Sequence, residues 1–80
     1  MSFRRRQYST INIGKNGLTE QVVEEIKRRL KREKVVKVRV LRNSPLREMD
    51  RRRMAETIAE AVQAELCSVR GFTILLVKRE

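Results

Sequence analysis

The chain has 80 residues, with 20 Lys and Arg against 10 Asp and Glu and no His, which gives a net charge of +10 at pH 7. Its hydrophobic fraction of 40% is enough for one small core, so we expect a single domain over residues 8–80 after a basic arm over residues 1–7. The longest apolar run, Ile74 to Val77, is far shorter than the roughly 20 residues that cross a bilayer. No apolar segment follows the basic start, and Cys67 is the only cysteine. We therefore expect no secretory signal, no membrane association, no disulfide and a cytoplasmic location.

The residue types that are missing narrow the chemistry. Without His and with a single Cys, the chain cannot form a zinc site of the usual ligands or a nucleophile–histidine pair. No lysine stands at the end of a P-loop spacing. We therefore expect no enzyme, no metal, no cofactor and no small-molecule substrate. So much positive charge on so small a chain predicts a polyanionic partner.

The first half of the chain predicts a strand, a glycine-bounded loop and a helix. Tyr8–Ile13 alternates apolar and polar residues with the period of a strand. Gly14–Gly17 breaks this pattern, and Thr19 then offers an N-cap for a helix that runs to about Glu33. The apolar stripe of this helix comprises Val22, Val23, Ile26 and Leu30.

A second strand and a second helix follow. Val35–Leu41 again alternates, and Arg42–Pro45 reads as a turn. Ser44 can cap the next helix, and Pro45 suits its first position. We expect this helix to run to about Leu66, because its apolar residues recur at four-residue spacing: Met54, Ile58, Val62 and Leu66.

The chain ends in a predicted hairpin. Cys67–Arg70 forms its short first strand, Gly71 allows the turn, and Phe72–Lys78 is the last strand. Both faces of this last strand are mostly apolar, which places it inside the sheet. The order βαβαββ predicts a two-layer α/β domain, with a mixed four-stranded sheet and two helices on one face. We expect a monomer, although the apolar last strand leaves a dimer open.

This order places two loops at one edge of the sheet. A strand–helix–strand unit gives parallel strands, so the loops after the first two strands meet where the strands end. The expected edge carries positive charge from Lys15, Arg42 and Arg47, and the residues Gly14 and Gly17 would let a sugar-phosphate backbone approach. Helix N-termini at the same edge would add a partial positive charge.

The sequence at this loop resembles a known family. The string INIGKNGLT at residues 11–19, the strand VVKVRV at residues 35–40 and the closing GFTILLVKR at residues 71–79 are similar to the CRM domain of YhbY-like proteins. The resemblance covers roughly residues 11–79. It implies a fold similar to the C-terminal domain of translation initiation factor three. It also implies a GxxG loop at Gly14, Lys15, Asn16 and Gly17 that contacts RNA, and association with ribosomal or pre-ribosomal RNA in ribosome assembly.

Other basic residues are predicted as secondary RNA contacts. They lie in the arm, on the second strand, in the second helix and at the C-terminal end: Arg4, Arg5, Arg6, Lys37, Arg39, Arg51, Arg52, Lys78 and Arg79. Aromatic residues are scarce, and Tyr8 can supply at most one stacking ring on a sheet face. We therefore expect contacts to the phosphate backbone to dominate over base stacking.

Two other functions fit the same charge. One is a DNA-coating chromatin protein of the Alba kind, which the GKNGLT string and the absence of a long hairpin arm disfavour. The other is a protein–protein adaptor for an acidic partner. An adaptor would bind nucleic acid weakly and without selectivity. A preference for structured RNA over duplex DNA would distinguish the RNA-binding protein from the Alba-like protein.

Overall fold

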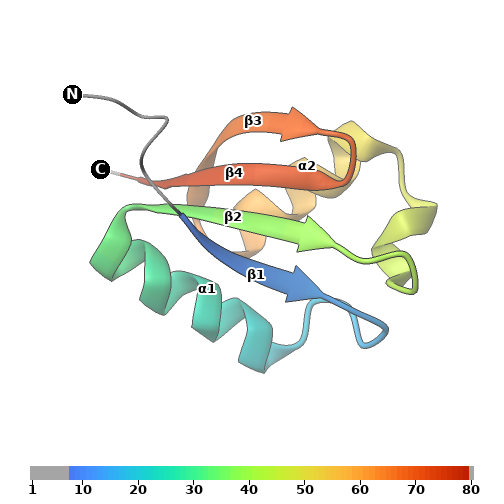
Figure 1. Ribbon diagram of the computed structural model, residues 1–80, viewed down its shortest axis with the longest axis horizontal. Coiled ribbons are helices and arrows are strands. Elements are labelled where there is room, and N and C mark those ends of the chain that lie inside the picture. Colours follow the sequence, from blue (N-terminus) through green and yellow to red (C-terminus); the bar gives the residue numbers. More distant parts are fainter. Residues whose placement is uncertain (1–7, 80) are drawn as a thin grey trace.

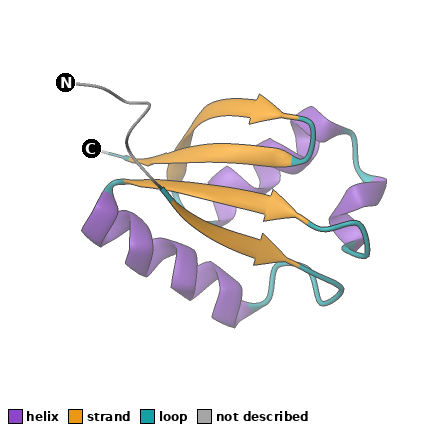
Figure 2. Cartoon of the chain, in the orientation of Figure 1, coloured by secondary structure: helices purple, strands orange, loops and turns teal. Residues whose placement is uncertain are grey.

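The domain is a four-stranded mixed sheet with both α-helices on one face (Figures 1 and 2). The structure is a computed structural model that describes residues 8–79. Its elements in chain order are β1 (Ser9–Ile13), α1 (Glu20–Glu33), β2 (Val35–Val40), the 3-10 helix η2 (Pro45–Glu48), α2 (Arg51–Ala61), β3 (Ala64–Arg70) and β4 (Thr73–Lys78). The strand order is β1-β2-β4-β3, which confirms the predicted fold class and the interior position of the last strand.

The two faces of the sheet differ because side chains alternate along each strand. β1 pairs parallel with β2, and β4 pairs antiparallel with both β2 and β3. One face buries apolar side chains under the helices. The core consists of Ile11, Ile13, Ile26, Leu30, Val36, Val38, Val40, Met54, Ala55, Ile58, Ala59, Val62, Ala64, Ile74 and Leu76. No helix within residues 8–79 covers the other face, so the sheet is open on that side (Figure 1).

Helix α1 begins and ends where the sequence predicts. The Thr19 hydroxyl accepts a hydrogen bond from the Val22 amide (3.1 Å), which satisfies one of the free N–H groups of the first turn. At the other end, Lys34 adopts a left-handed conformation (φ 72°) and donates its amide to the Leu30 carbonyl (2.8 Å). Ile26 and Leu30 are the buried residues of the helix.

The predicted second helix is wrong at both ends. Ser44 and Pro45 do start a helical turn, but it is η2, and extended backbone at Met49 ends it. Asp50 then caps α2, accepting a hydrogen bond from the Arg53 amide. The interruption gives the chain two short helical segments where the four-residue spacing predicts one.

The C-terminal end of that helix is also corrected. α2 ends at Ala61, and Gln63 reverses the chain in a left-handed conformation (φ 57°). β3 then begins at Ala64, so Leu66 belongs to a strand. Leu66 lies four residues after Val62 and two after Ala64, so it fits the helical and the strand period equally well. The first strand of the hairpin therefore has seven residues instead of the short segment expected from Cys67.

The helices remain short. Over residues 8–79, none is long and apolar enough to cross a membrane.

Candidate nucleic-acid interface

The loops after β1 and β2 pack against each other at the carboxyl end of both strands (Figure 1). The Leu41 amide donates to the Ile13 carbonyl (2.9 Å), which extends the parallel pairing into both loops. A Cβ built on Gly14 would lie 3.9 Å from Asn43 Oδ1, and one built on Gly17 would lie 3.4 Å from Pro45 Cγ. We call this surface, residues 14–17 and 42–47, the loop shelf.

The two glycines of the shelf serve different purposes. Gly17 is buried, has a left-handed φ of 68° and donates its amide to the Gly14 carbonyl (3.0 Å). A side chain here would be strained and would press on Pro45, so Gly17 supports the fold. Gly14 has an ordinary φ, and a Cβ on it would meet nothing closer than 3.9 Å. Only Gly14 therefore has the space that the sequence predicts for an approaching backbone.

The charged side chains of the shelf project from its loops. Lys15 and Asn16 are exposed between the two glycines, and Arg42 is exposed in the turn after β2. That turn is closed by the Ser44 amide, which donates to the Leu41 carbonyl (3.0 Å). Helix α1 begins two residues beyond Leu18, so the positive end of its dipole lies at the same edge of the sheet. The shelf thus combines side-chain cations with small residues.

Arg47 is the most constrained cation of the shelf. Its guanidinium carbon lies 3.7 Å from the centroid of the Phe72 ring, and its Nε donates to the Val40 carbonyl (3.3 Å). Arg51, at the start of α2, lies 5.9 Å from the same centroid. Phe72 itself is tied to β2, because its carbonyl accepts from the Val40 amide (2.8 Å). The hairpin between β3 and β4 therefore holds two arginines beside the loops.

Acidic residues are also present near this edge. Glu48 ends η2 and Asp50 caps α2, and both are exposed. Arg52 lies 3.7 Å from Glu56 on the exposed side of α2, so part of its charge is compensated. Lys15, Arg42, Arg47 and Arg51, by contrast, take part in none of the ion pairs found among residues 8–79. Of the His, Cys, Asp and Glu in residues 8–79, no group of three or more could hold a metal ion.

The other predicted contacts lie elsewhere on the molecule. Lys37 and Arg39 are exposed on the open face of the sheet. Lys78 and Arg79 line a small basic pocket with Lys27 and Lys31 at the opposite end of the sheet. The predicted contacts in the basic arm (Arg4, Arg5 and Arg6) lie outside the described residues.

Sequence reasoning missed two residues that the structure draws attention to. Arg47 stacks on the Phe72 ring with Arg51 nearby, and Arg70 lines the open face from β3. Phe72 follows the hairpin glycine, but no local pattern marks its contacts with Arg47 and Arg51, which lie far from it along the chain. Arg70 lies in the predicted first strand of the hairpin, but the register shift between Leu66 and Ser68 interrupts the alternation that would assign its face.

The end of the sheet away from the shelf is held by a hydrogen-bonded pair. The Ser9 hydroxyl lies 2.7 and 2.9 Å from the two carboxylate oxygens of Glu33, which links β1 to the last turn of α1. This hydrogen bond is the main reason that the pKa of Glu33 lies below its ordinary value, with Arg32 and Arg29 adding to it. The pair is structural and far from the loops.

Comparison with known proteins gives matches over most of the chain. The family model of the CRS1 / YhbY (CRM) domain matches residues 4–78. Probable RNA-binding protein MJ0652 of Methanocaldococcus jannaschii is 39% identical over 66 residues, which are 82% of this chain and 48% of that protein. The chain therefore spans about half the length of this curated relative.

A solved structure shares the fold. The solution structure of the hypothetical protein SAV1595 from Staphylococcus aureus, which has been suggested to bind RNA, superposes with a TM-score of 0.69 at 30% sequence identity. The match covers 96% of this chain and 76% of that one.

Proposed function

Because the chain belongs to the CRS1 / YhbY (CRM) domain family, we propose that it binds structured RNA through the loop shelf, and that this RNA is ribosomal or pre-ribosomal. The names of both relatives support RNA as the class of partner. A role in ribosome assembly is the finer part of this proposal. It rests on the resemblance of the GKNGLT loop to small members of the family.

The packing of the two loops is the observation that carries the proposal. The 3.4 Å approach of the Gly17 position to Pro45 fixes the Lys15 loop beside the Arg42 turn. A phosphate backbone lying on the shelf could then meet Lys15, Arg42 and Arg47 without a change in the fold. Arg47 would lose little conformational entropy on binding, because Phe72 and the Val40 carbonyl already restrict it.

Each part of the shelf has a role in this proposal. Asn16 and the backbone amide of Gly14 would hydrogen-bond to phosphate or ribose oxygens. Lys15 and Arg42 would neutralise phosphates, and Arg47 would bind one with its planar guanidinium group. Such contacts position an RNA without reading its sequence, so selectivity would come from the shape of the RNA. Nothing in this arrangement requires a catalytic group.

A double variant of the loop tests the proposal. Lys15→Glu with Asn16→Glu should lower affinity for a structured ribosomal RNA fragment from several-fold to about a hundred-fold, because it puts acids against phosphate. The matched control is Lys31→Glu with Gln63→Glu, which changes the net charge equally at the opposite end of the sheet. Equal losses in both variants would show that binding depends on net charge alone and would refute the shelf.

Competition distinguishes RNA from DNA. Equal masses of structured RNA and duplex DNA are competed for the protein at one salt concentration, since affinities at different salt are not comparable. We expect the structured RNA to displace the duplex DNA from the protein. A preference for duplex DNA would instead support the Alba-like alternative, and weak binding of both would support the adaptor. Crosslinking in cells, followed by sequencing of the bound RNA, tests the ribosomal assignment.

A further inference from the structure

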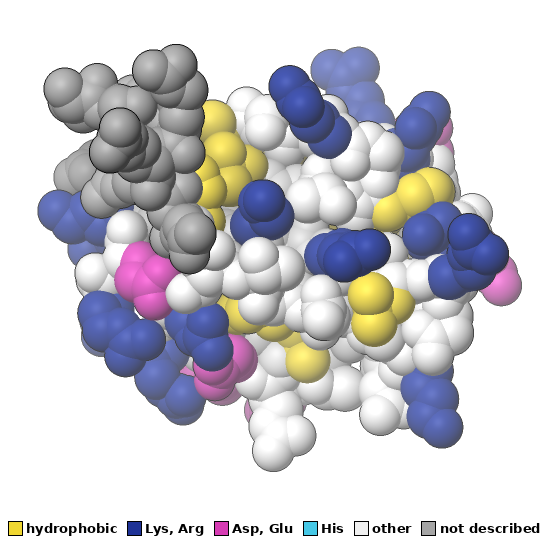
Figure 3. All heavy atoms as spheres, in the orientation of Figure 1, with side chains coloured by type: hydrophobic (Ala, Val, Ile, Leu, Met, Phe, Trp, Pro, Cys, Tyr) yellow, Lys and Arg dark blue, Asp and Glu magenta, His cyan; other side chains and the backbone are white. Residues whose placement is uncertain are grey.

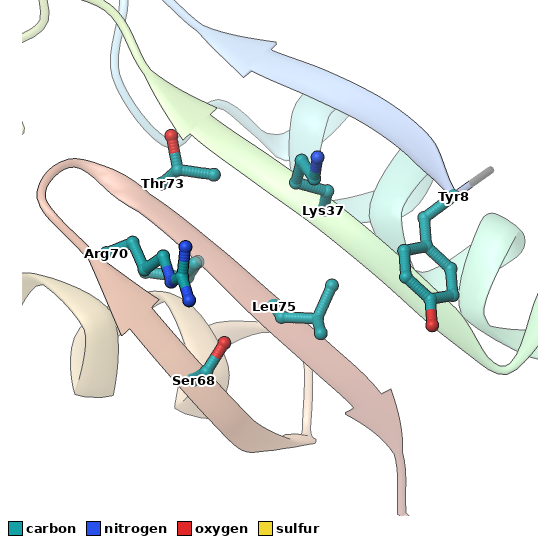
Figure 4. Close-up of a pocket in the computed structure, with 7 residues that line it drawn as sticks. Tyr8, Lys37, Ser68, Arg70, Thr73 and Leu75 are labelled. Atoms are coloured by element: carbon teal, nitrogen blue, oxygen red, sulfur yellow. The ribbon is translucent and has the colours of Figure 1, made fainter. Parts of the chain in front are cut away.

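The open face of the sheet contains a shallow groove with a volume of about 650 Å³. It is lined by Tyr8, Lys37, Ser68, Arg70, Thr73, Ile74 and Leu75. Figure 4 shows the Tyr8 ring extending from the start of β1 over β2, with Arg70 and Thr73 at the other end and Lys37 and Leu75 between them. We call this surface the sheet groove.

The strand register explains why these side chains converge. Lys37 pairs with Leu75, Ser68 pairs with Leu75 from the other side, and Arg70 pairs with Thr73. Paired residues in a sheet point to the same face, so Lys37 and Arg70 stand on either side of β4. With strands about 4.8 Å apart, two strand spacings separate them laterally by roughly 10 Å. A narrow chain could lie along β4 between the two cations.

The chemistry of the groove differs from that of an ordinary solvated sheet face. Leu75 is only half-buried, and it lies beside its pairing partner Lys37, between Arg70 and the Tyr8 ring along the groove. The lining residues within the described part of the chain include two cations, three hydroxyl groups and no acid. Glu65 is the acid of β3 on this face, and it lies opposite Val77, farther along the strand. Figure 3 shows Lys and Arg side chains over the middle of this face, with acids mainly toward its rim.

We propose that the sheet groove binds a single-stranded segment of RNA, with one base stacked on Tyr8 and Leu75 and the flanking phosphates held by Lys37 and Arg70. This inference rests on the proposed function, because it assumes that the protein binds RNA, but it names a second site for a different part of the ligand. The occupant follows from charge complementarity, since two cations on either side of an apolar floor match a base between two phosphates. The volume is within the range of small-ligand pockets and is sufficient for a nucleotide.

The single aromatic ring limits how many bases the sheet groove can stack and how selectively it binds them. Stacking on an aromatic side chain is tolerant of base identity, because every base has a π-face. One ring therefore holds one unpaired base without strong sequence preference. The hydroxyls of Ser68 and Thr73 are able to hydrogen-bond with a ribose. A structured RNA with an unpaired nucleotide next to a helix would engage the groove and the loop shelf together.

Tyr8 provides a built-in probe, because the chain has one Tyr and no Trp. The full chain is titrated with a six-nucleotide oligouridylate while its tyrosine emission is recorded, with N-acetyltyrosinamide as the control for absorbance by the RNA. We expect the emission of Tyr8 to be quenched with saturation. An oligonucleotide of equal length without bases should leave the emission nearly unchanged. Equal quenching by both would overturn the stacked base.

Variants separate the base contact from the phosphate contacts. Tyr8→Ala should lower affinity for a labelled oligouridylate about five-fold or more, whereas Tyr8→Phe should stay within about two-fold because it keeps the ring. Lys37→Ala with Arg70→Ala should reduce the slope of log K against log[salt] by roughly 1.4. The matched control, Lys27→Ala with Lys31→Ala on the helical side, should leave that slope nearly unchanged. Amide spectra of each variant verify the fold.

The outcomes distinguish this inference from the proposed function. If Lys15→Glu with Asn16→Glu abolishes binding of structured RNA and no oligouridylate quenches Tyr8, the shelf stands and the groove is refuted. If the loop variant binds structured RNA as the parent does while Tyr8 is still quenched, the shelf is refuted and the groove stands. If the Tyr8 emission per mole of protein changes with protein concentration and does not change with RNA, a second copy of the chain covers this face. That result would also overturn the inference.

Discussion

The loop shelf and the sheet groove are both basic, but they are built from different parts of the chain. The shelf depends on backbone: two loops close enough that Gly17 leaves only 3.4 Å for a Cβ beside Pro45. The groove depends on side chains that alternate along three strands, with Leu75 between Lys37 and Arg70 and Tyr8 at one end. A backbone surface suits phosphate and shape, whereas a surface with a ring suits an unpaired base. The two proposals therefore assign different parts of an RNA to the two surfaces.

The two glycines of the shelf allow the sharpest separation of fold from binding. Gly17→Ala should destabilise the domain by about 1–3 kcal/mol, because alanine is strained at φ 68° and its methyl group meets Pro45. Gly14→Ala should change stability by less than about 0.5 kcal/mol yet weaken binding of structured RNA, since the methyl group occupies the approach to the shelf. Urea unfolding measures the stability of both variants, and titration with structured RNA measures their affinity. A stable Gly17→Ala protein would contradict the packing of the loops.

The stacked arginine joins the shelf to the hairpin. Phe72→Leu keeps an apolar side chain but removes the ring, so it should cost about 0.5–1 kcal/mol of stability through the lost contact with Arg47. RNA binding should weaken by two- to five-fold, roughly as expected for a similar free energy. Phe72→Tyr is the matched control, and it should retain both the stability of the domain and the affinity for RNA. If Phe72→Leu leaves RNA binding unchanged, Arg47 acts in the fold and does not need to be held for RNA.

The salt dependence of binding tests whether Arg42 neutralises a phosphate. Arg42→Ala should make the negative slope of log K against log[salt] for structured RNA shallower by about 0.7–0.9, while stability changes little. Arg28→Ala, at an exposed position of α1 paired with Glu25, is the control and should not alter the slope. Equal slopes for the parent and Arg42→Ala would remove Arg42 from the interface.

The smallest effect is expected far from both surfaces. Ser9→Ala removes the hydroxyl that lowers the pKa of Glu33 below 4.5. A lowered folded-state pKa means that the ionised carboxylate adds stability above its ordinary pKa, and that this stability is lost as the pH falls below 4.5. The parent should therefore be slightly more stable than Ser9→Ala at pH 7, and the difference should disappear as the pH falls through the lowered pKa of Glu33. Equal unfolding midpoints at pH 7 would remove this pair from the stability of the domain, and RNA binding should not change.

Much of this arrangement follows from local patterns in the sequence. Alternation in β1, β2 and β4 and the Thr19 cap predict the order βαβαββ, and parallel strands place the two loops at one edge. The groove could not be predicted, because it depends on the order of the strands in the sheet and on the face that Ser68 and Arg70 take. A register shift between Leu66 and Ser68 interrupts the alternation that would assign this face. The contacts of Phe72 were also out of reach, since they depend on how a hairpin meets the start of α2 in space. Local periodicity identifies elements, whereas contacts between distant elements decide which side chains share a surface.

The central claim is that RNA lies on the loop shelf, and amide chemical shifts test it most directly. The isotope-labelled full chain is titrated with a structured ribosomal RNA fragment, and shifts are mapped over residues 8–79. The largest shifts are expected at Lys15, Asn16, Arg42 and Asn43, with little change at Lys31 and Gln63 at the opposite end of the sheet. Shifts that are largest at Lys31 and Gln63, with residues 14–17 unchanged, would contradict the account.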